Sequence, residues 1–533
     1  MCRKKEIFEF QGCLFHGCLK CNGDKTFNPI FQCSNYLLRL RTEKKIEFLK
    51  KEYPEFEIVE IWEHEWDKLC TSESLKFENP KQSMNIREAL YGGRTNAIKL
   101  YHKCKNDEKI FYYDFTSLYP AVQKYGTYPK GHPTIFTENF DYNKTYFGLI
   151  KCKVLPPRGL YIPVLPVNID GKLLFPLCYT CAKQKNMNIV CIHTEEERVI
   201  EGTWVSLELY KAIEYGYKLI EYYCIYHFNE SLEYDPKSKS GGLFTEYVNQ
   251  NLKEKQESSG FPSYCVNDDL KKEYIQKYFE KEAILLDFNN IIKNSGKREI
   301  AKIKLNSLWG YFALNSNKTQ FKIVNNKAEI ENLLNDEQYI VHDIDTKDEN
   351  FAQVMYSIKE EYLFGGLSSN VIIAAFVTAQ GRLKLYEELS KLGTRVFYFD
   401  TDSLIFVGSP GQYMPELGDY LGNFTNELDD DDYITEFVAG GPKNYSYKTF
   451  KGQTDCTIKG YPINHITNLI LNFDSVKNCV VENRETKLKI PQLKFVKDKS
   501  EWIIKTENQE KEYRFVYDKR VLRDDFTTLP FGY

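Results

Sequence analysis

The chain has 533 residues and a formal net charge of −4; 42% of its residues are hydrophobic and 27% are charged. This length exceeds one compact core and the composition is that of a globular protein, so we expect roughly two to four domains, without the basic surplus that nucleic-acid binders usually carry. The sequence has neither a secretory leader nor an apolar run long enough to span a bilayer, which predicts a soluble, intracellular protein whose 15 cysteines are thiols or metal ligands rather than disulfides.

The first region, residues 1–80, combines a cluster of Cys and His residues with a charged run of helical character. Together with Trp62-Glu63-His64, the cluster resembles the zinc-bearing part of very-short-patch-repair endonucleases. No upstream acid completes a nuclease centre, so we expect structural zinc or an inert remnant rather than cleavage. The candidate zinc ligands are Cys13, His16, Cys18, Cys21 and His64.

Residues 81–150 alternate turn signals with strand-like blocks. The run Lys109–Tyr113 is rich in β-forming residues and ends at Asp114, and a turn closed by Pro120 follows. A strand that ends in this way can contribute one carboxylate to a metal site.

Residues 151–267 open with a Pro- and Cys-rich segment, which predicts an irregular insertion. The spacing of its first two cysteines is that of a zinc knuckle, whereas the last two candidate ligands are unusually close in sequence. Structural zinc and unligated thiols in a small core both remain open. The four residues are Cys178, Cys181, Cys191 and His193.

Residues 268–315 carry a helical pattern from 268 to 312. At ~100° per residue, one face of this helix presents two cations, an amide and an aromatic ring. Arginine can grip a phosphate through two hydrogen bonds and lysine neutralises it as a point charge, so this face suits a triphosphate. The alternative is an ordinary exposed basic face. The residues are Arg298, Lys302, Asn306 and Trp309.

Residues 316–425 begin with a second insertion and contain a predicted buried helix at 366–390, capped by Ser368, Ser369 or Asn370. Two acid-rich segments, His342–Asp345 here and Asp429–Asp432 beyond, lack flanking strand pairs. We expect both to be solvated loops.

A hairpin with two acids at its tip is predicted at 395–407. Two β-rich runs flank Asp400-Thr401-Asp402, and because side chains alternate along a strand, Asp400 and Asp402 share one face. With Asp114 they can hold two Mg²⁺ or Mn²⁺ ions for phosphoryl transfer. An acidic turn in water is the alternative.

Three segments in order resemble motifs A, B and C of family B DNA polymerases: DFTSLYP at 114–120, KIKLNSLWG at 302–310 and YFDTDS at 398–403. The resemblance implies an α+β multidomain protein shaped like a right hand. Its parts are a template-contacting segment and the first part of an antiparallel palm at 81–150, an insertion at 151–267 and helical fingers at 268–315. The second insertion and the palm with the catalytic hairpin occupy 316–425, and the thumb occupies 426–533.

The resemblance also implies roles for single residues. Asp114 and Asp402 would bind the catalytic Mg²⁺ or Mn²⁺ ions, and Asp400 would support them. Backbone amides near Phe115 and Thr116 would cradle the triphosphate, and Tyr119 would lie under the deoxyribose. The nucleotide-binding set is Phe115, Thr116, Ser117, Leu118, Tyr119, Arg298, Lys302, Asn306 and Trp309.

Further segments resemble the protein-primed branch of family B, in particular the polymerases of Maverick/Polinton transposons and related viruses. That branch implies primer–template DNA, dNTPs and a terminal protein as partners, and a nuclear or viral replication site in a eukaryotic host. Template contacts would come from Tyr91, Gly92, Gly93 and Arg94, and primer contacts from Lys443, Tyr445 and Lys459.

No Asp-x-Glu strand of a 3′–5′ exonuclease precedes Tyr91, which predicts polymerisation without proofreading. The main alternative is a catalytically decayed transposon polymerase that binds DNA. Tyr311, which replaces a usual Lys or Arg, favours decay, whereas intact Asp114 and Asp402 count against it. The separated acids at the hairpin tip disfavour a reverse transcriptase or RNA polymerase, and a nuclease built on the N-terminal cluster is the weakest interpretation.

Overall fold

The computed structural model contains two compact units, Met1–Lys81 and Gln82–Tyr533. Among the residues it describes, no helix is both long and apolar enough to cross a membrane. The described residues are 6–23, 26–28, 31–71, 84–315, 317–346, 350–359, 362, 369–498, 501 and 503–533.

The first unit is a small α/β module. Strand β1 (Glu6–Gln11) pairs in parallel with β4 (Glu57–Trp62), and helix α2 (Asn35–Glu52) lies between them in sequence. The α2 helix is the predicted charged helical run, and it buries one side through Leu38, Thr42 and Ile46. The shorter elements are α1 (Leu19–Asn22), β2 (Phe27–Asn28), β3 (Cys33–Ser34) and α3 (Glu63–Thr71).

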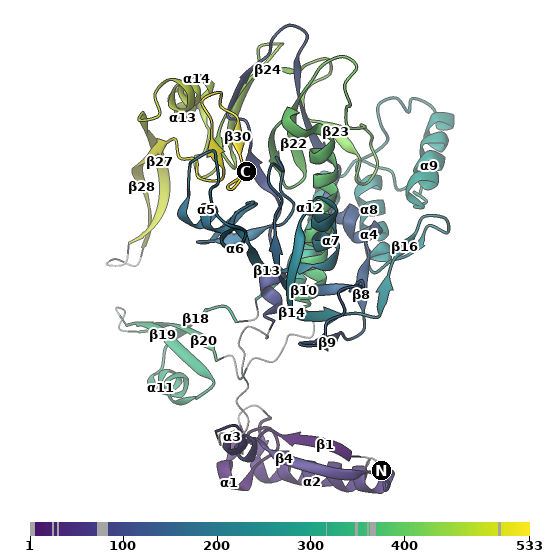
Figure 1. Ribbon diagram of the computed structural model, residues 1–533, viewed down its shortest axis with the longest axis vertical. Coiled ribbons are helices and arrows are strands. Elements are labelled where there is room, and N and C mark those ends of the chain that lie inside the picture. Colours follow the sequence, from purple (N-terminus) through teal and green to yellow (C-terminus); the bar gives the residue numbers. More distant parts are fainter. Residues whose placement is uncertain are drawn as a thin grey trace. The chain divides into compact units, whose positions relative to one another are not determined.

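A nine-stranded antiparallel sheet forms the centre of the second unit (Figure 1). It confirms the strand predicted at 109–113 and the hairpin predicted at 395–407, which become three neighbouring strands. The main order is β26 (Thr454–Ile458), β25 (Asn444–Thr449), β24 (Ile434–Gly441), β7 (Lys109–Phe115), β22 (Ser403–Gly408), β21 (Val396–Asp400) and β5 (Thr95–Ala97), with β23 (Phe424–Asn426) beside β7 and β6 (Tyr101–Lys103) beside β24.

The sheet continues past the expected start of the thumb at residue 426. Strands β24 to β26 pair with one another, and β24 also contacts β7 through Ile434 and Ile110. Strands β24 to β26 therefore belong to the same sheet as the acid-bearing strands, and β24 is buried at all but one of its positions.

Helix α12 (Val371–Leu392) is the predicted buried helix, and it is buried on nearly every side. Asn370 caps it, since its Oδ1 accepts a hydrogen bond from the backbone N–H of Ile373 (3.1 Å). Ser368, another predicted cap, lies outside the described residues. The α12 helix packs against α4 (Leu118–Tyr125), α7 (Ser206–Glu214) and α10 (Ser295–Phe312).

The helical pattern predicted from 268 to 312 forms two helices, α9 (Asp268–Glu282) and α10. Ala283 ends α9 in the left-handed conformation (φ 58°), and Asn294 caps α10 by accepting from the N–H of Lys297 (3.0 Å). A third helix, α8 (Thr245–Glu257), packs along α10.

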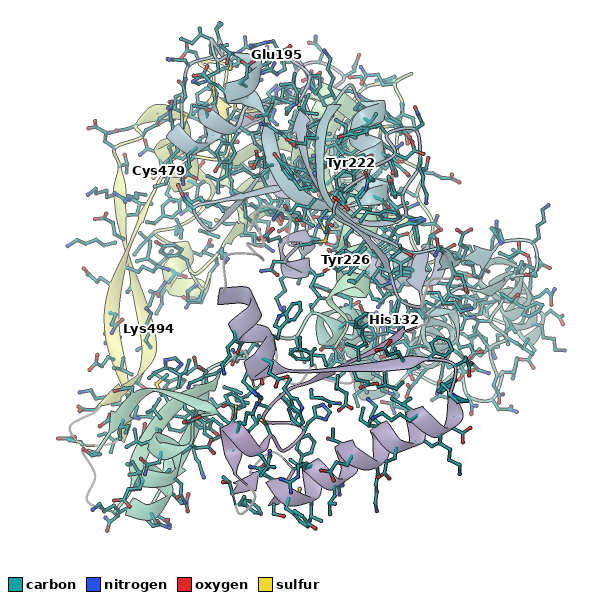
Figure 2. The ribbon with its side chains drawn as sticks, turned by 60° about the horizontal axis from the view of Figure 1, so that its bottom comes forward. His132, Glu195, Tyr222, Tyr226, Cys479 and Lys494 are labelled. Carbon is teal, nitrogen blue, oxygen red and sulfur yellow. The ribbon has the colours of Figure 1, made fainter. Side chains whose placement is uncertain are left out.

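A four-stranded sheet covers part of the region predicted as an irregular insertion. Its strands β13 (Ile200–Val205), β10 (Gly148–Leu155), β14 (Lys218–His227) and β9 (Thr134–Phe136) are adjacent in that order. Tyr222 and Tyr226 mark β14 in Figure 2. The segment between β10 and β13 contains only short elements: β11 (Val167–Ile169), β12 (Lys172–Leu174), α5 (Tyr179–Gln184) and α6 (Glu195–Arg198).

A small module corrects the expectation for one of the two acid-rich segments. His342–Asp345 was predicted as a loop but lies in β19 (Tyr339–Asp345), because Val341 and Ile344 pack into a small core. That strand joins β20 (Ala352–Ile358) and β18 (Gln320–Val324), with α11 (Lys327–Asn335) alongside.

The segment Asp429–Asp432 does form turns, as predicted, but its last residue is not solvated. The carboxylate of Asp432 is buried and accepts from the backbone N–H groups of Tyr433 (2.9 Å) and Lys451 (3.1 Å). Further along the chain, β27 (Lys487–Asp498) and β28 (Ile503–Arg514) form a long hairpin, marked by Lys494 in Figure 2.

Candidate active site

Three acidic side chains meet where β7 lies beside the hairpin β21–β22. The first residue of β22 pairs with Asp114, and the backbone N–H of Phe115 donates to the carbonyl oxygen of Asp402 (2.7 Å). Thr401 closes the hairpin in the left-handed conformation (φ 59°), between Asp400 and Asp402. Strand pairing therefore holds the three acids together, and we call Asp114, Asp400 and Asp402 the acid site.

The acid site lines a cavity of about 390 Å³. Its walls combine carboxylates with tyrosines and one lysine, a set that suits a hard cation and the oxygens of a phosphate. The lining residues are Tyr112, Asp114, Tyr398, Asp400, Thr401, Asp402, Ser403, Lys443 and Tyr445.

Burial prevents two of these acids from ionising freely. Desolvation, reinforced by the negative charges of Asp402 and Glu427, raises the pKa of Asp114 to about 7. The pKa of Asp402 is raised as well, first by desolvation and then by the charges of Asp400 and Glu427. A divalent cation would offset these charges, so Asp114 and Asp402 fit the expected metal.

Asp400 differs from the other two acids because the protein already supplies its partners. Thr95 donates its hydroxyl to Asp400 Oδ1 (2.8 Å), Tyr398 donates its hydroxyl to Oδ2 (3.3 Å), and Lys443 Nζ forms an ion pair with Oδ2 (3.1 Å). This arrangement fits the supporting role expected for Asp400.

The segment Tyr91–Arg94 braces the turn of the acid site. A Cβ atom on Gly93 would lie 2.5 Å from Thr401 Oγ1, and the N–H of Thr401 donates to the carbonyl of Arg94 (2.8 Å). The guanidinium of Arg94 donates to backbone carbonyls in the interior. Template contacts were expected here, but the side chains of Tyr91 and Arg94 are buried and lie out of reach of a DNA strand in this structure.

Three cations gather on α8 and α10. Lys255 donates to Ser117 Oγ (3.2 Å), and its pKa is lowered by burial and by the charges of Arg298 and Lys302. The charge of Lys302 also lowers the pKa of Asp114, so its influence extends to the acid site. We call Lys255, Arg298 and Lys302 the basic triad; three cations in one place favour a polyanion such as a triphosphate.

The backbone after Asp114 departs from what the sequence predicted. The N–H groups of Phe115 and Thr116 donate to the carbonyls of Asp402 (2.7 Å) and Asn423 (2.8 Å), so they are not free to cradle a triphosphate. Ser117, in the left-handed conformation (φ 56°), then turns the chain into α4. The side chain of Ser117 therefore faces the basic triad, where its Oγ accepts from Lys255.

Two aromatic rings form a flat wall between α4 and α10. The rings of Tyr119 and Trp309 have centroids 4.8 Å apart and planes inclined by 33°. Tyr119 also packs on Gly381 of α12, where a Cβ would lie 3.3 Å from the ring. Asn306, one turn before Trp309, is exposed. Such a wall suits contact with a sugar or base.

Lys443 and Tyr445 border the acid site, as their place in the sheet requires. The Tyr445 ring lies 4.7 Å from that of Tyr398, and its hydroxyl is 3.1 Å from that of Tyr112. Lys459 joins them only through its backbone, whose N–H donates to the carbonyl of Lys443 (2.7 Å), while its side chain is exposed.

Residues 60–390, more than half of the chain, match the model of the family described as DNA polymerase type B, organellar and viral. The chain belongs to this family. The "DNA polymerase" of Kluyveromyces lactis is 22% identical over 410 residues, which cover 74% of this chain and 34% of that protein. A "Probable DNA polymerase" of Agaricus bitorquis is 23% identical over 248 residues, covering 45% of this chain and 22% of that protein.

The type B chain thus spans about a third or less of these curated relatives. A solved structure titled Phi29 DNA polymerase complexed with primer-template DNA and incoming nucleotide substrates aligns with 85% of this chain and 66% of the other. The sequence identity in that alignment is 15% and the TM-score is 0.47.

The sequence analysis missed two residues of the candidate site. Lys255 lies in helix α8, where lysines and glutamates alternate near the end. No sequence pattern there distinguishes Lys255, which faces Ser117, from the other lysine. Glu427 follows β23, and its charge acts on both Asp114 and Asp402. The sequence signal that could have found Glu427 is its position just before the acid-rich segment Asp429–Asp432.

Two Cys/His groups have the geometry of metal sites, one in each unit. In the second unit, His193 Nδ1 lies 3.4, 3.2 and 3.6 Å from the sulfurs of Cys178, Cys181 and Cys191, and the last two sulfurs are 3.6 Å apart. Ligands of a tetrahedral zinc ion lie about 3.5–3.8 Å apart, given ordinary Zn–S and Zn–N bond lengths. The four ligand atoms therefore fit one zinc ion.

The first unit brings together four of the five predicted ligands: Cys13, Cys18, Cys21 and His64, whose ligand atoms lie within 4.8 Å of one another. His16 is not among them. Its Nδ1 is instead 3.0 Å from the hydroxyl of Thr42 on α2, because the turn after Cys13 directs its ring toward that helix.

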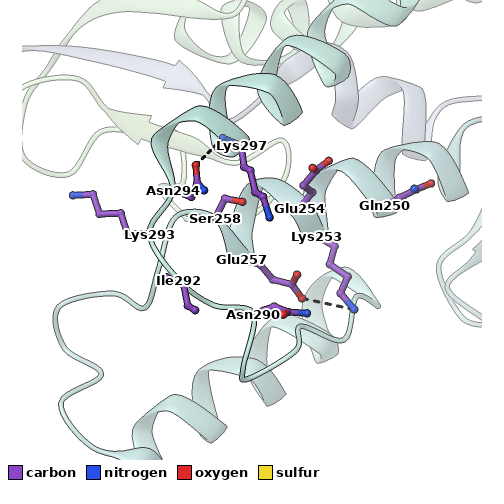
Figure 3. A pocket seen from close by; sticks show the side chains of 10 residues that line it. All are labelled: Gln250, Lys253, Glu254, Glu257, Ser258, Asn290, Ile292, Lys293, Asn294 and Lys297. Atoms are coloured by element: carbon purple, nitrogen blue, oxygen red, sulfur yellow. Dashed lines mark hydrogen bonds and ion pairs between the residues drawn. The ribbon is translucent and has the colours of Figure 1, made fainter.

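A second cavity, of about 460 Å³, lies between α8 and the start of α10 (Figure 3). Two of its charged side chains, Lys253 and Glu257, form an ion pair (3.7 Å), and Glu254 pairs with Lys304 outside the cavity (3.2 Å). The lining includes none of the acid-site or basic-triad residues: Gln250, Lys253, Glu254, Glu257, Ser258, Asn290, Ile292, Lys293, Asn294 and Lys297.

Proposed function

We propose that this chain is a DNA-directed DNA polymerase that adds dNTPs to a primer 3′-hydroxyl. One observation carries the proposal: Asp114 and Asp402, two partly buried acids with raised pKa, lie together beside paired strands, and the charge of Lys302, a member of the basic triad, reaches Asp114. The first arrangement favours divalent cations and the second a triphosphate. Together they match the two halves of a nucleotidyl transfer site.

In the proposed reaction the primer 3′-oxygen bonds to the α-phosphorus of the dNTP as the bond to pyrophosphate breaks. Two cations would activate the attacking oxygen and neutralise the leaving one. Asp114 and Asp402 hold that position on paired strands. Lys255, Arg298 and Lys302 grip the triphosphate, while the Tyr119–Trp309 wall orients the nucleoside.

The right-hand layout follows from the same assignment. The nine-stranded sheet would be the palm, helices α8 to α10 the fingers, and the hairpin β27–β28 part of the thumb. The exposed Lys443 beside Asp400 is placed to hold a primer terminus.

The first experiment measures extension of a labelled primer on a DNA template with Mg²⁺ or Mn²⁺. We expect Asp402→Asn to lower the rate by at least about 10³-fold, because it removes a charge that holds the cations. The matched control is Asp430→Asn, an exposed acid outside the site. Equal extension by Asp402→Asn would refute the proposal, and a folded wild type that binds primer–template without extending it would favour a decayed, DNA-binding protein.

We further infer that synthesis is protein-primed and replicates a transposon or viral genome. The organellar and viral family and the Maverick/Polinton-like segments support this. A protein-linked nucleotide, formed without any nucleic-acid primer and removed by protease, would be the expected product. The sequence before Tyr91 offers no exonuclease motif, so we expect these 533 residues not to remove a mismatched primer end.

We also propose that both Cys/His groups hold structural zinc. Each offers four closely spaced ligands and leaves no position for a substrate, which is typical of structural rather than catalytic zinc. The purified chain should contain two zinc ions by elemental analysis. A chain purified without zinc that folds and melts normally would contradict this proposal.

A further inference from the structure

Given the zinc site proposed in the second unit, we infer that Cys178, Cys181, Cys191 and His193 form a metal-dependent anchor for residues 524–533. Through these residues the anchor fixes the strand that supports Asp400. The zinc would thus act on the polymerase reaction at a distance, as a positioning device.

The first link joins the cluster to the last residues of the sequence. The N–H of Leu177, next to the first ligand, donates to the carbonyl of Phe531 (2.7 Å), and the Phe531 ring is 1% exposed. Gly532 has φ +86° and packs so closely that a Cβ there would lie 2.2 Å from the Cβ of Cys178. Only glycine fits this contact, so the ligand loop and residues 531–532 hold each other in place.

The loop that carries the four ligands, from Cys178 to His193, contains little regular secondary structure. Its one helix, α5, has six residues. Arg158 donates to the carbonyls of Cys191 (2.9 Å) and His193 (3.0 Å), and Arg198 donates to that of Leu177 (3.4 Å). These bonds position the backbone but do not join the four ligand side chains. A metal ion would supply that closure, as it does in other small irregular segments.

The second link joins the anchored residues to the acid site. The N–H of Thr528 donates to the carbonyl of Ile98 (3.1 Å), and the N–H of Leu100 donates to that of Phe526 (2.8 Å). These residues directly follow β5, whose Thr95 pairs with Asp400 and donates its hydroxyl to it (2.8 Å). A continuous set of contacts therefore leads from Cys178 to Asp400.

This path matters because β5 is a short strand at one end of the large sheet. It has three residues and stands at the end of the strand order, with β21 as its one neighbour along that path. A short edge strand depends on what packs against it. Loss of the anchor should therefore loosen Thr95 and misplace Asp400, while the basic triad on α8 and α10 stays intact. We expect a lower kcat with little change in the KM for dNTP.

Two variants of the full chain test the anchor. Cys181→Ser removes a zinc ligand. Gly532→Ala instead breaks the contact with Cys178 and leaves all four ligand residues unchanged in the sequence. The control is Gly452→Ala, because Gly452 has a matching φ of +85° but no atom within 4 Å of an added Cβ. Each protein is measured for zinc content, for tryptic release of residues 524–533 after the exposed Arg523, and for kcat and KM in primer extension.

We expect Cys181→Ser to lose one zinc ion per chain, and Gly532→Ala to lose none. Both should release residues 524–533 to trypsin and lower kcat by about tenfold, as misplacement of a supporting group does. Gly452→Ala should match the wild type. Circular dichroism and the melting temperature establish that each variant is folded.

Two results would overturn the anchor. In the first, Cys181→Ser loses zinc but keeps the wild-type tryptic pattern and kcat. In the second, it loses no zinc, which would also remove the zinc proposal for this cluster but leave the polymerase proposal intact. If the wild type proved inactive, the polymerase proposal would fail, and the tryptic pattern of Gly532→Ala against Gly452→Ala would still decide whether the anchor exists.

Discussion

The acid site and the basic triad are carried by different kinds of secondary structure. The acids lie beside paired strands, whose backbone hydrogen bonds fix them. For example, the N–H of Phe115 donates to the carbonyl of Asp402. The cations lie at the ends of long side chains on two helices, and their contacts are weaker, as in the exposed pair of Arg298 and Glu299 (3.2 Å). One half of the site is held rigidly by strand pairing, and the other depends on long side chains, of which Lys302 is exposed and Lys255 and Arg298 are partly buried.

This difference assigns different work to the two halves. Metal-assisted transfer tolerates little displacement of the ligands, so the acids need the rigidity of the sheet. In the proposed reaction a triphosphate would enter and pyrophosphate would leave, which suits cations carried on long side chains. The acid half should therefore be sensitive to small backbone changes, and the basic half to loss of charge.

After the loss of Asp402 itself, the next largest effect should come from a backbone change that leaves every charge in place. In Gly93→Ala the added Cβ would meet Thr401 at 2.5 Å and displace the turn between Asp400 and Asp402. We expect kcat in primer extension to fall by about 10²-fold, since a 1 Å displacement has that effect on a catalytic geometry.

The neighbouring glycine provides the control, because an added Cβ on Gly92 meets nothing within 4 Å. Gly92→Ala should retain wild-type kcat. Adding Thr401→Gly to Gly93→Ala removes the clash and should recover part of the rate. A Gly93→Ala enzyme with normal kcat would show that the turn is not rigid.

The basic half should respond to charge instead. Lys255→Ala removes one of three phosphate partners, and we expect the KM for dNTP to rise by about tenfold with a smaller fall in kcat. Lys253→Ala is the matched control, because Lys253 lies on the same helix but pairs with Glu257 at the second cavity (Figure 3). Equal effects from both lysines would indicate a general loss of positive charge rather than a site.

The sequence predicted much of the rigid half. Runs of β-forming residues located both strands and the hairpin that carry Asp114, Asp400 and Asp402, because period-two patterns and tight turns are local signals. Asn370 was among the three caps predicted for α12, because a cap is also a local signal that depends on the residues that follow it.

The contacts that organise the site were not predictable, because they join distant segments. Lys255 meets Ser117 across 138 residues, and Gly93 meets Thr401 only once the sheet has formed. Arg94 looked like a DNA-binding cation, but its burial follows from tertiary packing. His342–Asp345 was misjudged because a bulge between Val341 and Asp343 interrupts the alternation that would have marked the strand.

A smaller effect concerns stability and its dependence on pH. The pKa of Asp114 rises from 3.8 to about 7 in the folded protein, so the folded state holds a proton that the unfolded state releases between these values. Compared with a variant that has an uncharged residue at position 114, the wild type therefore loses stability as the pH rises from 3.8 to about 7. In Mg²⁺-free buffer, Asp114→Asn should be more stable than the wild type by about 1 kcal/mol at pH 8, after allowance for solvent screening.

Urea unfolding at pH 3 and pH 8 measures this difference, and it should nearly vanish at pH 3, which lies below both pKa values, so that both states keep the proton. Saturating Mg²⁺ should reverse the order at pH 8, because only the wild type binds the cation at full strength. A variant that is less stable at pH 8 without Mg²⁺ would mean that Asp114 is stabilised by its surroundings rather than strained by them.

The smallest effect should come from Glu427, which influences the acid site only through its charge. The side chain is exposed, so water and salt screen its action on Asp114 and Asp402. Glu427→Gln should keep the extension rate at pH 8 within about twofold and shift the acidic limb of the pH–rate profile down by about 0.3 unit. Added salt should shrink that shift. A loss of tenfold or more would instead make Glu427 a direct metal ligand, and the acid site would then extend beyond the rigid sheet onto the loop that follows β23.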